Sequence, residues 1–343
     1  MQKFKIDSEE VAAIQKLVAG ITARYDSSED PEFLMESTLL AHELPRRLRA
    51  ALHSFKLAEP DSALFVISGY PVDDEKIGRT PEHWDLTAAQ RRPTLEEEIL
   101  FVLACSLLGE CIGWSTQQGG RIIHDVMPVR GMEQEQIGIG SEQLITWHTE
   151  DAFHPLHGDY IGMMFLRNPD RVATTFASLA GLDLDPEDWR LLFEPHFTIQ
   201  PDKSHRPENA ANANSNGNGQ GDGHLYDQIE KMWKEPEKIP LLSGDPRSPY
   251  IRIDPYFMDP AADTPKAQRA FEALVKALDA RIGDLVLEPG DICFIDNMKA
   301  VHGRRAFKAR YDGRDRWFKR TNITRDLRRS RAARPEATSR IIQ

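Results

Sequence analysis

From residue 113 onward, the chain is a succession of short strand-like segments separated by turn residues, and this pattern restricts the fold more than any other feature. Parallel α/β folds alternate strands with helices, whereas only two helix-like segments interrupt this block. We therefore expect a mainly β fold with flanking helices, in which the strands close into a barrel or a jelly roll. The predicted strands are 114–118, 122–129, 144–148, 160–166, 172–178, 196–200, 250–254, 285–287, 292–295 and 317–324.

Helical patterns dominate residues 1–112, which we expect to support the strand block. Asp7 and Glu10 have the spacing of a capping box, and apolar residues of helical period follow them. Further helices are predicted over 31–55 with a bend near Pro45, and over 94–112, 185–194 and 264–282, with one buried strand over 62–68.

The chain carries 43 Lys and Arg against 54 Asp and Glu, a net charge of −11 at pH 7. Broad binding to nucleic acid or to anionic membranes needs a basic face, so we expect neither partner. Cys105 and Cys111 lie in an apolar run and, with Cys293, predict buried thiols rather than a disulfide scaffold. The sequence shows no signal peptide and no apolar run near the ~20 residues of a membrane span, which predicts a cytoplasmic protein. It does not specify an oligomeric state.

We expect residues 1–324 to form one domain, with 1–112 as helical support and 113–324 as the β core. Residues 209–223 contain almost no apolar side chains and cannot bury enough surface to offset the entropy of ordering. The insertion around them, about 201–235, is either a surface linker or a lid over an active site. Residues 325–343 contain six arginines without a core pattern, which predicts a solvated basic tail.

His148 and Glu150 are the first candidates for chemistry. In an extended segment, residues two apart point to one face, so the imidazole and the carboxylate can converge on a metal. His302 follows a strand, a Pro-Gly turn and a second strand, and it can supply a third ligand. Two histidines and one carboxylate on one face of the ion are typical of mononuclear non-haem Fe(II) oxygenases. His-x-Glu tripeptides also occur by chance, so an ordinary surface histidine is the alternative for His148.

Arg316 and Arg320 follow His302 in a strand-like segment. An iron oxygenase that uses 2-oxoglutarate needs a cation for the distal carboxylate of this co-substrate, and the planar fork of arginine binds a carboxylate through two hydrogen bonds. The alternative is that both arginines are surface charges on a strand.

Three motifs carry a resemblance to a known family: HTEDAF at 148–153, DNMKAVHGR at 296–304 and YDGRDRWFKRTNITRDLRRSRAAR at 311–334. Together they resemble the clavaminate synthase-like Fe(II)/2-oxoglutarate oxygenases, above all the L-arginine hydroxylases of viomycin and streptolidine biosynthesis. The resemblance covers roughly residues 113–334. It implies a double-stranded β-helix, or jelly-roll, core, with Fe(II) as the metal and 2-oxoglutarate and O2 as co-substrates.

The resemblance also implies roles for individual residues, which are carried over position by position. The iron ligands would be His148, Glu150 and His302. Arg316 and Thr174 would contact 2-oxoglutarate, with Thr175 as a competing assignment. Arg320 would contact the α-carboxylate of an amino-acid substrate, Gln117 its α-amino group and Asp254 its cationic side chain, and Glu150 would lie beside that substrate.

Tyr256 departs from the family pattern, because the arginine hydroxylases that the chain resembles have a second acidic residue at this position. A phenol can stack on a planar guanidinium, or Tyr256 can simply pack as a core aromatic. An acid from the insertion, Asp222 or Asp227, could replace the lost contact.

The function predicted from these residues is hydroxylation of free L-arginine, or of a close derivative, at C3 or C4 in peptide-antibiotic metabolism, with release of succinate and CO2. The alternatives are another amino acid (lysine, citrulline or enduracididine), desaturation or cyclisation by the same fold, and a jelly-roll binding protein without catalytic activity.

Overall fold

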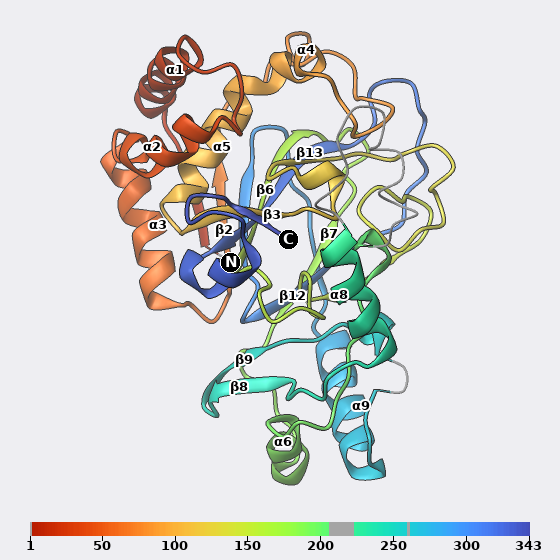
Figure 1. Ribbon diagram of the computed structural model, residues 1–343. Coiled ribbons are helices and arrows are strands. Elements are labelled where there is room, and N and C mark those ends of the chain that lie inside the picture. The colour runs from red at the N-terminus through yellow and green to blue at the C-terminus, as the bar shows by residue number, and fades with distance from the viewer. Residues whose placement is uncertain (1, 206–222, 259–260) are drawn as a thin grey trace.

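A computed structural model describes residues 2–205, 223–258 and 261–343 (Figure 1). The described chain is mainly β at its centre, with helices on the outside. The α-helices are α1 Ser8–Thr22, α2 Pro31–Ala41, α3 Arg46–Ala58, α4 Ala88–Arg91, α5 Leu95–Ser106, α6 Pro186–Leu192, α8 Gly223–Lys234 and α9 Pro265–Asp279. The strands are β1 Gln2–Lys5, β2 Leu64–Ser68, β3 Glu110–Trp114, β4 His124–Val126, β5 Ile145–His148, β6 Tyr160–Arg167, β7 Thr174–Ser178, β8 Leu242–Asp245, β9 Ser248–Ile251, β10 Gly283–Leu285, β11 Ile292–Asp296, β12 Ala300–Arg304, β13 Trp317–Thr324 and β14 Ile341–Ile342.

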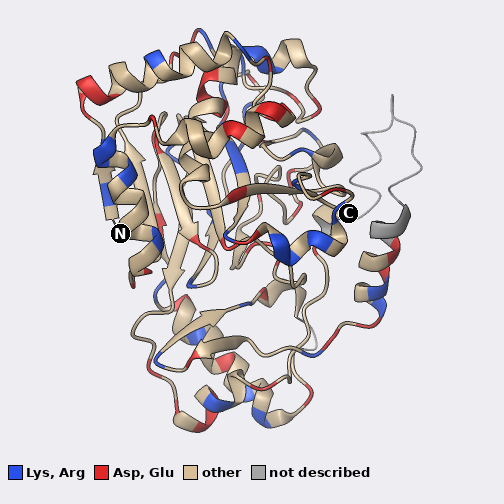
Figure 2. Cartoon of the chain, turned by 60° about the vertical axis from the view of Figure 1, so that its left-hand side comes forward, with Lys and Arg blue, Asp and Glu red and all other residues tan. Residues whose placement is uncertain are grey.

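Two sheets form the centre of the molecule. The larger has the order β1-β2-β11-β6-β13-β3-β14, with β4 also paired to β13, and the smaller has the order β10-β7-β12-β5. Side chains from both sheets share one apolar cluster, to which β6 contributes Phe165, β11 contributes Cys293 and β12 contributes Ala300. The two sheets therefore face each other across a common core, and Figure 2 shows their strands mostly free of charged residues.

The N-terminal helices cover one side of the larger sheet (Figure 1). Asp7 and Glu10 form the predicted capping box at the start of α1. The predicted bend at Pro45 is a break, because α2 ends at Ala41 and α3 begins after Pro45. The helix predicted over 94–112 ends earlier, at Ser106, and β3 begins at Glu110. Gly109 between them lies against the backbone of Thr324, where no Cβ would fit.

A second apolar cluster lies under α6, α9 and the hairpin of β8 and β9, at the bottom of Figure 1. The helices predicted over 185–194 and 264–282 are confirmed as α6 and α9. The strand predicted over 196–200 is wrong, since Phe197 makes only isolated bridges there. Residues 209–222 lie outside the described residues, and α8 follows them. The three cysteines are buried free thiols, as predicted. Within the described ranges, no helix is both long enough and apolar enough to cross a membrane.

The prediction of a solvated tail after residue 324 is wrong. Strand β14 pairs in parallel with β3, and Ile342 is fully buried. Arg334 donates to backbone carbonyl groups of its own loop, while Arg340 pairs with Glu110 and donates to the carbonyl of Leu34. The sequence pattern suggested solvated arginines because it does not reveal their partners, which are backbone oxygens and residues distant in sequence.

A buried ion network ties β4, β13 and α5 together. The Asp125 carboxylate and the Lys319 ammonium group are both 0% exposed and form an ion pair, and Lys319 also lies 2.7 Å from the Glu98 carboxylate. Asp125 accepts further hydrogen bonds from Arg121 (2.8 Å) and from the Trp317 indole (2.8 Å). Burial raises the pKa of Asp125, but Lys319 and Arg121 outweigh this and lower it to about 2.

Asp125→Asn should lower the free energy of unfolding at pH 7 by roughly 3 kcal/mol or more, because it leaves Lys319 buried with one partner fewer. A depressed carboxyl pKa contributes stability above its unfolded value of about 3.9, and this contribution is lost as pH falls toward the folded value. The difference from the wild type should therefore shrink between about pH 4 and about pH 2. Urea denaturation at a series of pH values measures it, and an equal difference at pH 7 and pH 3 would contradict the assignment.

Candidate metal centre and substrate pocket

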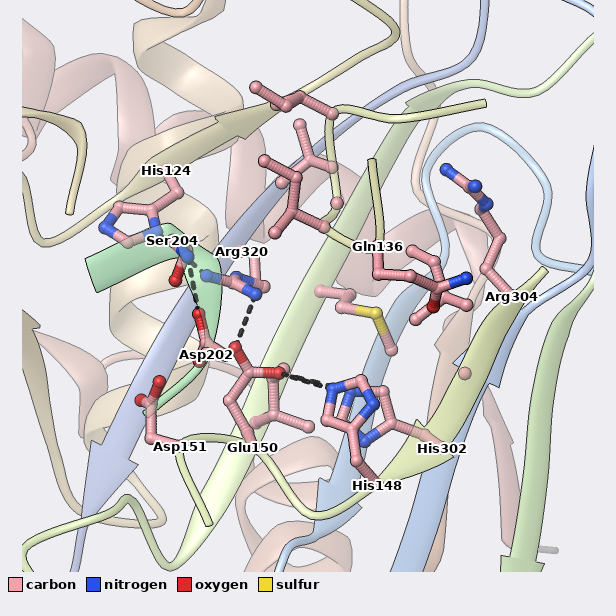
Figure 3. Close-up of a pocket in the computed structure, with 18 of the residues that line it drawn as sticks. His124, Gln136, His148, Glu150, Asp151, Asp202, Ser204, His302, Arg304 and Arg320 are labelled. Atoms are coloured by element: carbon pink, nitrogen blue, oxygen red, sulfur yellow. Dashed lines mark hydrogen bonds and ion pairs between the residues drawn. The ribbon is translucent and has the colours of Figure 1, made fainter. Parts of the chain in front are cut away.

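His148, Glu150 and His302 come together at the end of the smaller sheet (Figure 3). His148 ends β5 and stands opposite His302 on the antiparallel neighbour β12, so their ring centroids lie 4.8 Å apart. The Nε2 atoms of the two rings lie 3.6 Å and 3.3 Å from the same carboxylate oxygen, Oε2 of Glu150. His302 was predicted to follow the second strand of this segment, and the structure places it inside a further strand, β12.

Hydrogen bonds fix the ring of His148 and the backbone of Glu150. The Nδ1 atom of His148 lies 2.8 Å from the carbonyl oxygen of Thr146, so Nδ1 donates a proton there and Nε2 is the nitrogen that faces Glu150. Asn297 binds the backbone of Glu150. Its Oδ1 accepts from the backbone amide of Glu150 at 2.7 Å, and its Nδ2 donates to the carbonyl groups of Glu150 (3.1 Å) and Gly158 (2.9 Å). The ring of His148 and the backbone of Glu150 are therefore held in fixed positions by hydrogen bonds.

Two imidazole nitrogens and one carboxylate oxygen, with all ligand atoms within 4.8 Å of one another, fit a small divalent transition metal. All three residues line the pocket. This donor set matches the two-histidine, one-carboxylate arrangement of non-haem Fe(II) sites.

Arg320 lies beside the triad. It donates through Nη1 to Oε1 of Glu150, the oxygen that does not face the histidines, and through Nη2 to Nδ1 of His124 at 3.2 Å. Although burial alone raises the pKa of Glu150, Arg320 and the two imidazoles hold it well below its usual range. Burial and Arg320 lower the pKa of His124 to about 3, so this imidazole is neutral and accepts from the arginine.

Arg316 is buried without an acidic partner among the described residues. Its guanidinium carbon lies 4.4 Å from the ring centroid of Phe318 and 5.0 Å from that of Phe165. Nη2 donates to Oγ1 of Thr174 at 3.4 Å, and Nε has no partner. Burial, with a contribution from Arg304, lowers the pKa of Arg316 to about 9. Thr174 lines the pocket beside Arg316, and the competing Thr175 is not among its lining residues.

Asp254 and Asp202 bring two carboxylates to the same pocket. Burial raises the pKa of Asp254 to about 6; the imidazole of His148 opposes the rise, and the carboxylate of Asp202 adds to it. Tyr256 also lines the pocket and is 47% exposed, so it is not a core aromatic. Asp222 lies outside the described residues, whereas Asp227 is exposed on α8 and does not line the pocket.

Gln117 completes the predicted set. Its side chain is buried and lines the pocket; its Nε2 donates to Oγ of Ser204 at 2.7 Å, and its Oε1 has no partner. Apart from the alternatives Thr175 and Asp227, the predicted site residues that the structure describes therefore line one pocket.

Sequence reasoning missed Asp202, Ser204, His124 and Asn297. Asp202 lies in the insertion that was considered as a lid, so an acid there was expected but at the wrong position. Asn297 could have been found from its place at the strand end just before the segment that carries His302.

Comparisons with known proteins find one matching family and several similar enzymes. A model of the "Taurine catabolism dioxygenase TauD, TfdA family" matches residues 94–322. The chain is 45% identical to the enduracididine beta-hydroxylase of Streptomyces hygroscopicus and 44% identical to the L-ornithine/L-arginine 3-hydroxylase of Catenulispora acidiphila, with 100% of each chain covered. It is similar in structure to the non-heme iron oxygenase OrfP in complex with Fe, succinate and (3S)-hydroxy-L-Arg (TM-score 0.93, 41% identity, 100% of both chains). OrfP is also known in complex with Fe and alpha-ketoglutaric acid.

Asn297→Ala should weaken metal binding by about 10- to 100-fold, because groups that orient metal ligands typically contribute that much to affinity. Titration with Co(II), followed by its visible absorption, measures the affinity. The matched control is Asn168→Ala, which removes an equally buried amide that donates to the carbonyls of Val172 and Leu287, away from the pocket. Equal metal affinity of the Asn297 variant and the control would contradict the role given to Asn297.

Proposed function

The chain belongs to the TauD/TfdA family of dioxygenases, and we propose that it hydroxylates free L-arginine, or a close arginine derivative, at C3 with Fe(II), 2-oxoglutarate and O2. The observation that carries this proposal is the composition of the pocket. Its walls hold a metal-binding triad, an unpaired buried arginine and a pair of carboxylates, which together match an amino acid with a cationic side chain and a dicarboxylate co-substrate.

The described residues fit both iron and 2-oxoglutarate. His148, Glu150 and His302 would hold Fe(II), since their free lone pairs converge and a buried carboxylate kept ionised can bind a cation. Arg316 would hold the distal carboxylate of 2-oxoglutarate, with the hydroxyl group of Thr174 beside it. A buried guanidinium without an acidic partner is unfavourable by itself, and a bound carboxylate relieves this cost.

Three further groups support the placement of an amino acid. Arg320 uses two of its roughly five N–H donors on Glu150 and His124, which leaves donors for an α-carboxylate. The unpartnered Oε1 of Gln117 is a buried acceptor suited to the α-amino group. Asp254 and Asp202 both line the pocket, and the Asp202 carboxylate adds to the rise in the pKa of Asp254 that burial causes; a guanidinium near both would favour their charged forms.

Iron, 2-oxoglutarate and O2 together supply the oxidant that attacks an unactivated C–H bond, and the co-substrate leaves as succinate and CO2. The contribution of the chain is placement. Arg320 and Gln117 would fix the α-carbon end of the substrate beside Glu150, while Asp254 and Asp202 would hold the guanidinium. With both ends fixed, C3 is held near the triad, and such positioning accounts for a large part of catalysis in reactions of this type.

The arrangement of the two facing sheets supports a double-stranded β-helix, or jelly-roll, core. We further propose that residues 1–324 form one oxygenase domain, with the helices of residues 1–112 as support. Residues 325–343 add β14 to its larger sheet rather than a separate tail.

A cyclic guanidine such as enduracididine is a second candidate substrate, and one observation favours it. Tyr256 presents a half-exposed ring to the pocket in place of an acid, and a flat ring can stack there while Asp254 and Asp202 neutralise its charge.

The protein supplied with Fe(II) and 2-oxoglutarate should release succinate in response to L-arginine or L-enduracididine, with a product that has gained one oxygen atom. A product that has lost two hydrogens instead would indicate desaturation. Arg316→Met is the control, because the loss of a charge-assisted hydrogen-bond pair should raise the KM for 2-oxoglutarate at least about tenfold. Absence of substrate-stimulated succinate with any basic amino acid would overturn the proposal.

Asp254→Asn should raise the KM for L-arginine by about 10- to 100-fold, the value of a hydrogen bond to a charged group, and change the KM for neutral L-citrulline much less. Asp227→Asn is the matched control, since Asp227 is an exposed acid outside the pocket, and it should leave both constants unchanged. Steady-state kinetics with both substrates measures the difference. If Asp254→Asn affected arginine and citrulline equally, Asp254 would not be the partner of the cationic group.

A further inference from the structure

His205 is a fully buried histidine that does not line the pocket. It ends the short 3-10 helix Lys203–His205, and both of its ring nitrogens have partners. Nδ1 lies 2.7 Å from Oγ1 of Thr116, and Nε2 lies 3.1 Å from Oδ1 of Asp151. A polar ring without solvent contact is stable only when such partners are present, so these two contacts hold the helix in place.

The partners of His205 are themselves held firmly. Oδ2 of Asp151 accepts from the Trp114 indole and from the Asn322 amide, both at 2.7 Å. The rings of Trp114 and Phe153 meet the His205 ring edge-on, with centroids 5.4 Å and 4.8 Å away.

Asp151, Asp202 and His205 also have ligand atoms within 4.8 Å of one another, as a metal site would. However, the carboxylate of Asp151 already accepts hydrogen bonds on both of its oxygens. The group is therefore better described as an anchor of hydrogen bonds than as a second metal site.

The anchor positions residues that do face the pocket. Asp202 and Ser204 precede His205 in the chain and line the pocket, and Oδ1 of Asp202 accepts from the Ser204 amide at 2.7 Å. Gln117, the proposed acceptor for the α-amino group, donates to Ser204 and lies 3.0 Å from Nε2 of His205. Figure 3 shows Asp202 and Ser204 among the residues that line the pocket, with the hydrogen bond between them as a dashed line.

We propose that His205 is a positioning residue that sets the preference for a cationic side chain by holding Asp202 in the pocket wall. This inference rests on the proposed function and deepens it. His205 does not touch the substrate; it acts through Asp202. Burial lowers the pKa of His205, but the carboxylates of Asp202 and Asp151 outweigh this and raise it, consistent with a ring that donates to Asp151.

Three variants separate positioning from general structure. His205→Phe keeps the ring and its edge contacts but removes both hydrogen bonds. Thr116→Val removes only the hydroxyl group beside Nδ1 and keeps the shape of the side chain. His205→Gln retains an N–H group that can reach Asp151 and should restore part of the function.

The readout is the ratio of kcat/KM for L-arginine to that for L-citrulline, measured with the iron-loaded full chain. His205→Phe should lower this ratio by about tenfold through the KM for arginine, with a smaller decrease for Thr116→Val and partial recovery for His205→Gln. The KM for 2-oxoglutarate should stay unchanged. In an Asp202→Asn background, His205→Phe should not lower the ratio further, because the group it positions no longer carries a charge.

Equal losses for arginine and citrulline, or an undiminished effect in the Asp202→Asn background, would mean that His205 only stabilises the fold and would overturn the proposal. If His205→Phe does not fold, Thr116→Val decides by the same ratio.

Hydrogen–deuterium exchange of the Ser204 and His205 amides needs no turnover. Both amides should exchange faster in Thr116→Val than in the wild type, and unchanged exchange would also overturn the proposal. Wild-type turnover of arginine tests the proposed function separately.

Discussion

The pairing of β12 between β5 and β7 is the contact on which the pocket depends. It sets His302 directly opposite His148, and it runs Thr174 of β7 alongside Arg304 of β12. Because side chains alternate along a strand, a shift of one residue in this pairing would turn His302 away from Glu150. The register of three short strands thus determines whether the chain can bind a metal. Asn297, just before β12, adds the hydrogen bonds that keep Glu150 in line with both histidines.

The charges in the pocket are arranged at a cost to stability. Arg316 is buried without an acidic partner among the described residues, and burial and the Asp202 carboxylate raise the pKa of Asp254 although the His148 imidazole opposes the rise. Asp125 and Lys319, by contrast, form a closed ion network behind the same sheet. Charged groups that are paired within the chain stabilise the fold, whereas the unpaired charges in the pocket are suited to a ligand as their partner. Unpaired buried charges are therefore the clearest mark of function in this structure.

Many residues of the candidate site could be predicted from the local sequence. His148 and Glu150 are two residues apart at the end of β5, and Arg316 and Arg320 are four apart at the start of β13, so their spacing and chemistry could be interpreted directly. Family resemblance placed Thr174, Gln117 and Asp254. Asp202, His124 and His205 could not be found in this way, because each matters through a partner distant in the chain: Asp254, Arg320 and Asp151 respectively.

The sequence by itself determined the mainly β character, the helices of the N-terminal region and the chemistry of the metal ligands, because these depend on local periodicity and residue type. Only the tertiary structure decided that β12 is a strand, that the arginine-rich end packs against β3, and that Asp202 lines the pocket. The physical reason is the same in each case. Pairing between strands, burial of an arginine against carbonyl groups and repulsion between two carboxylates are interactions between residues far apart in sequence, and only the folded chain brings them into contact.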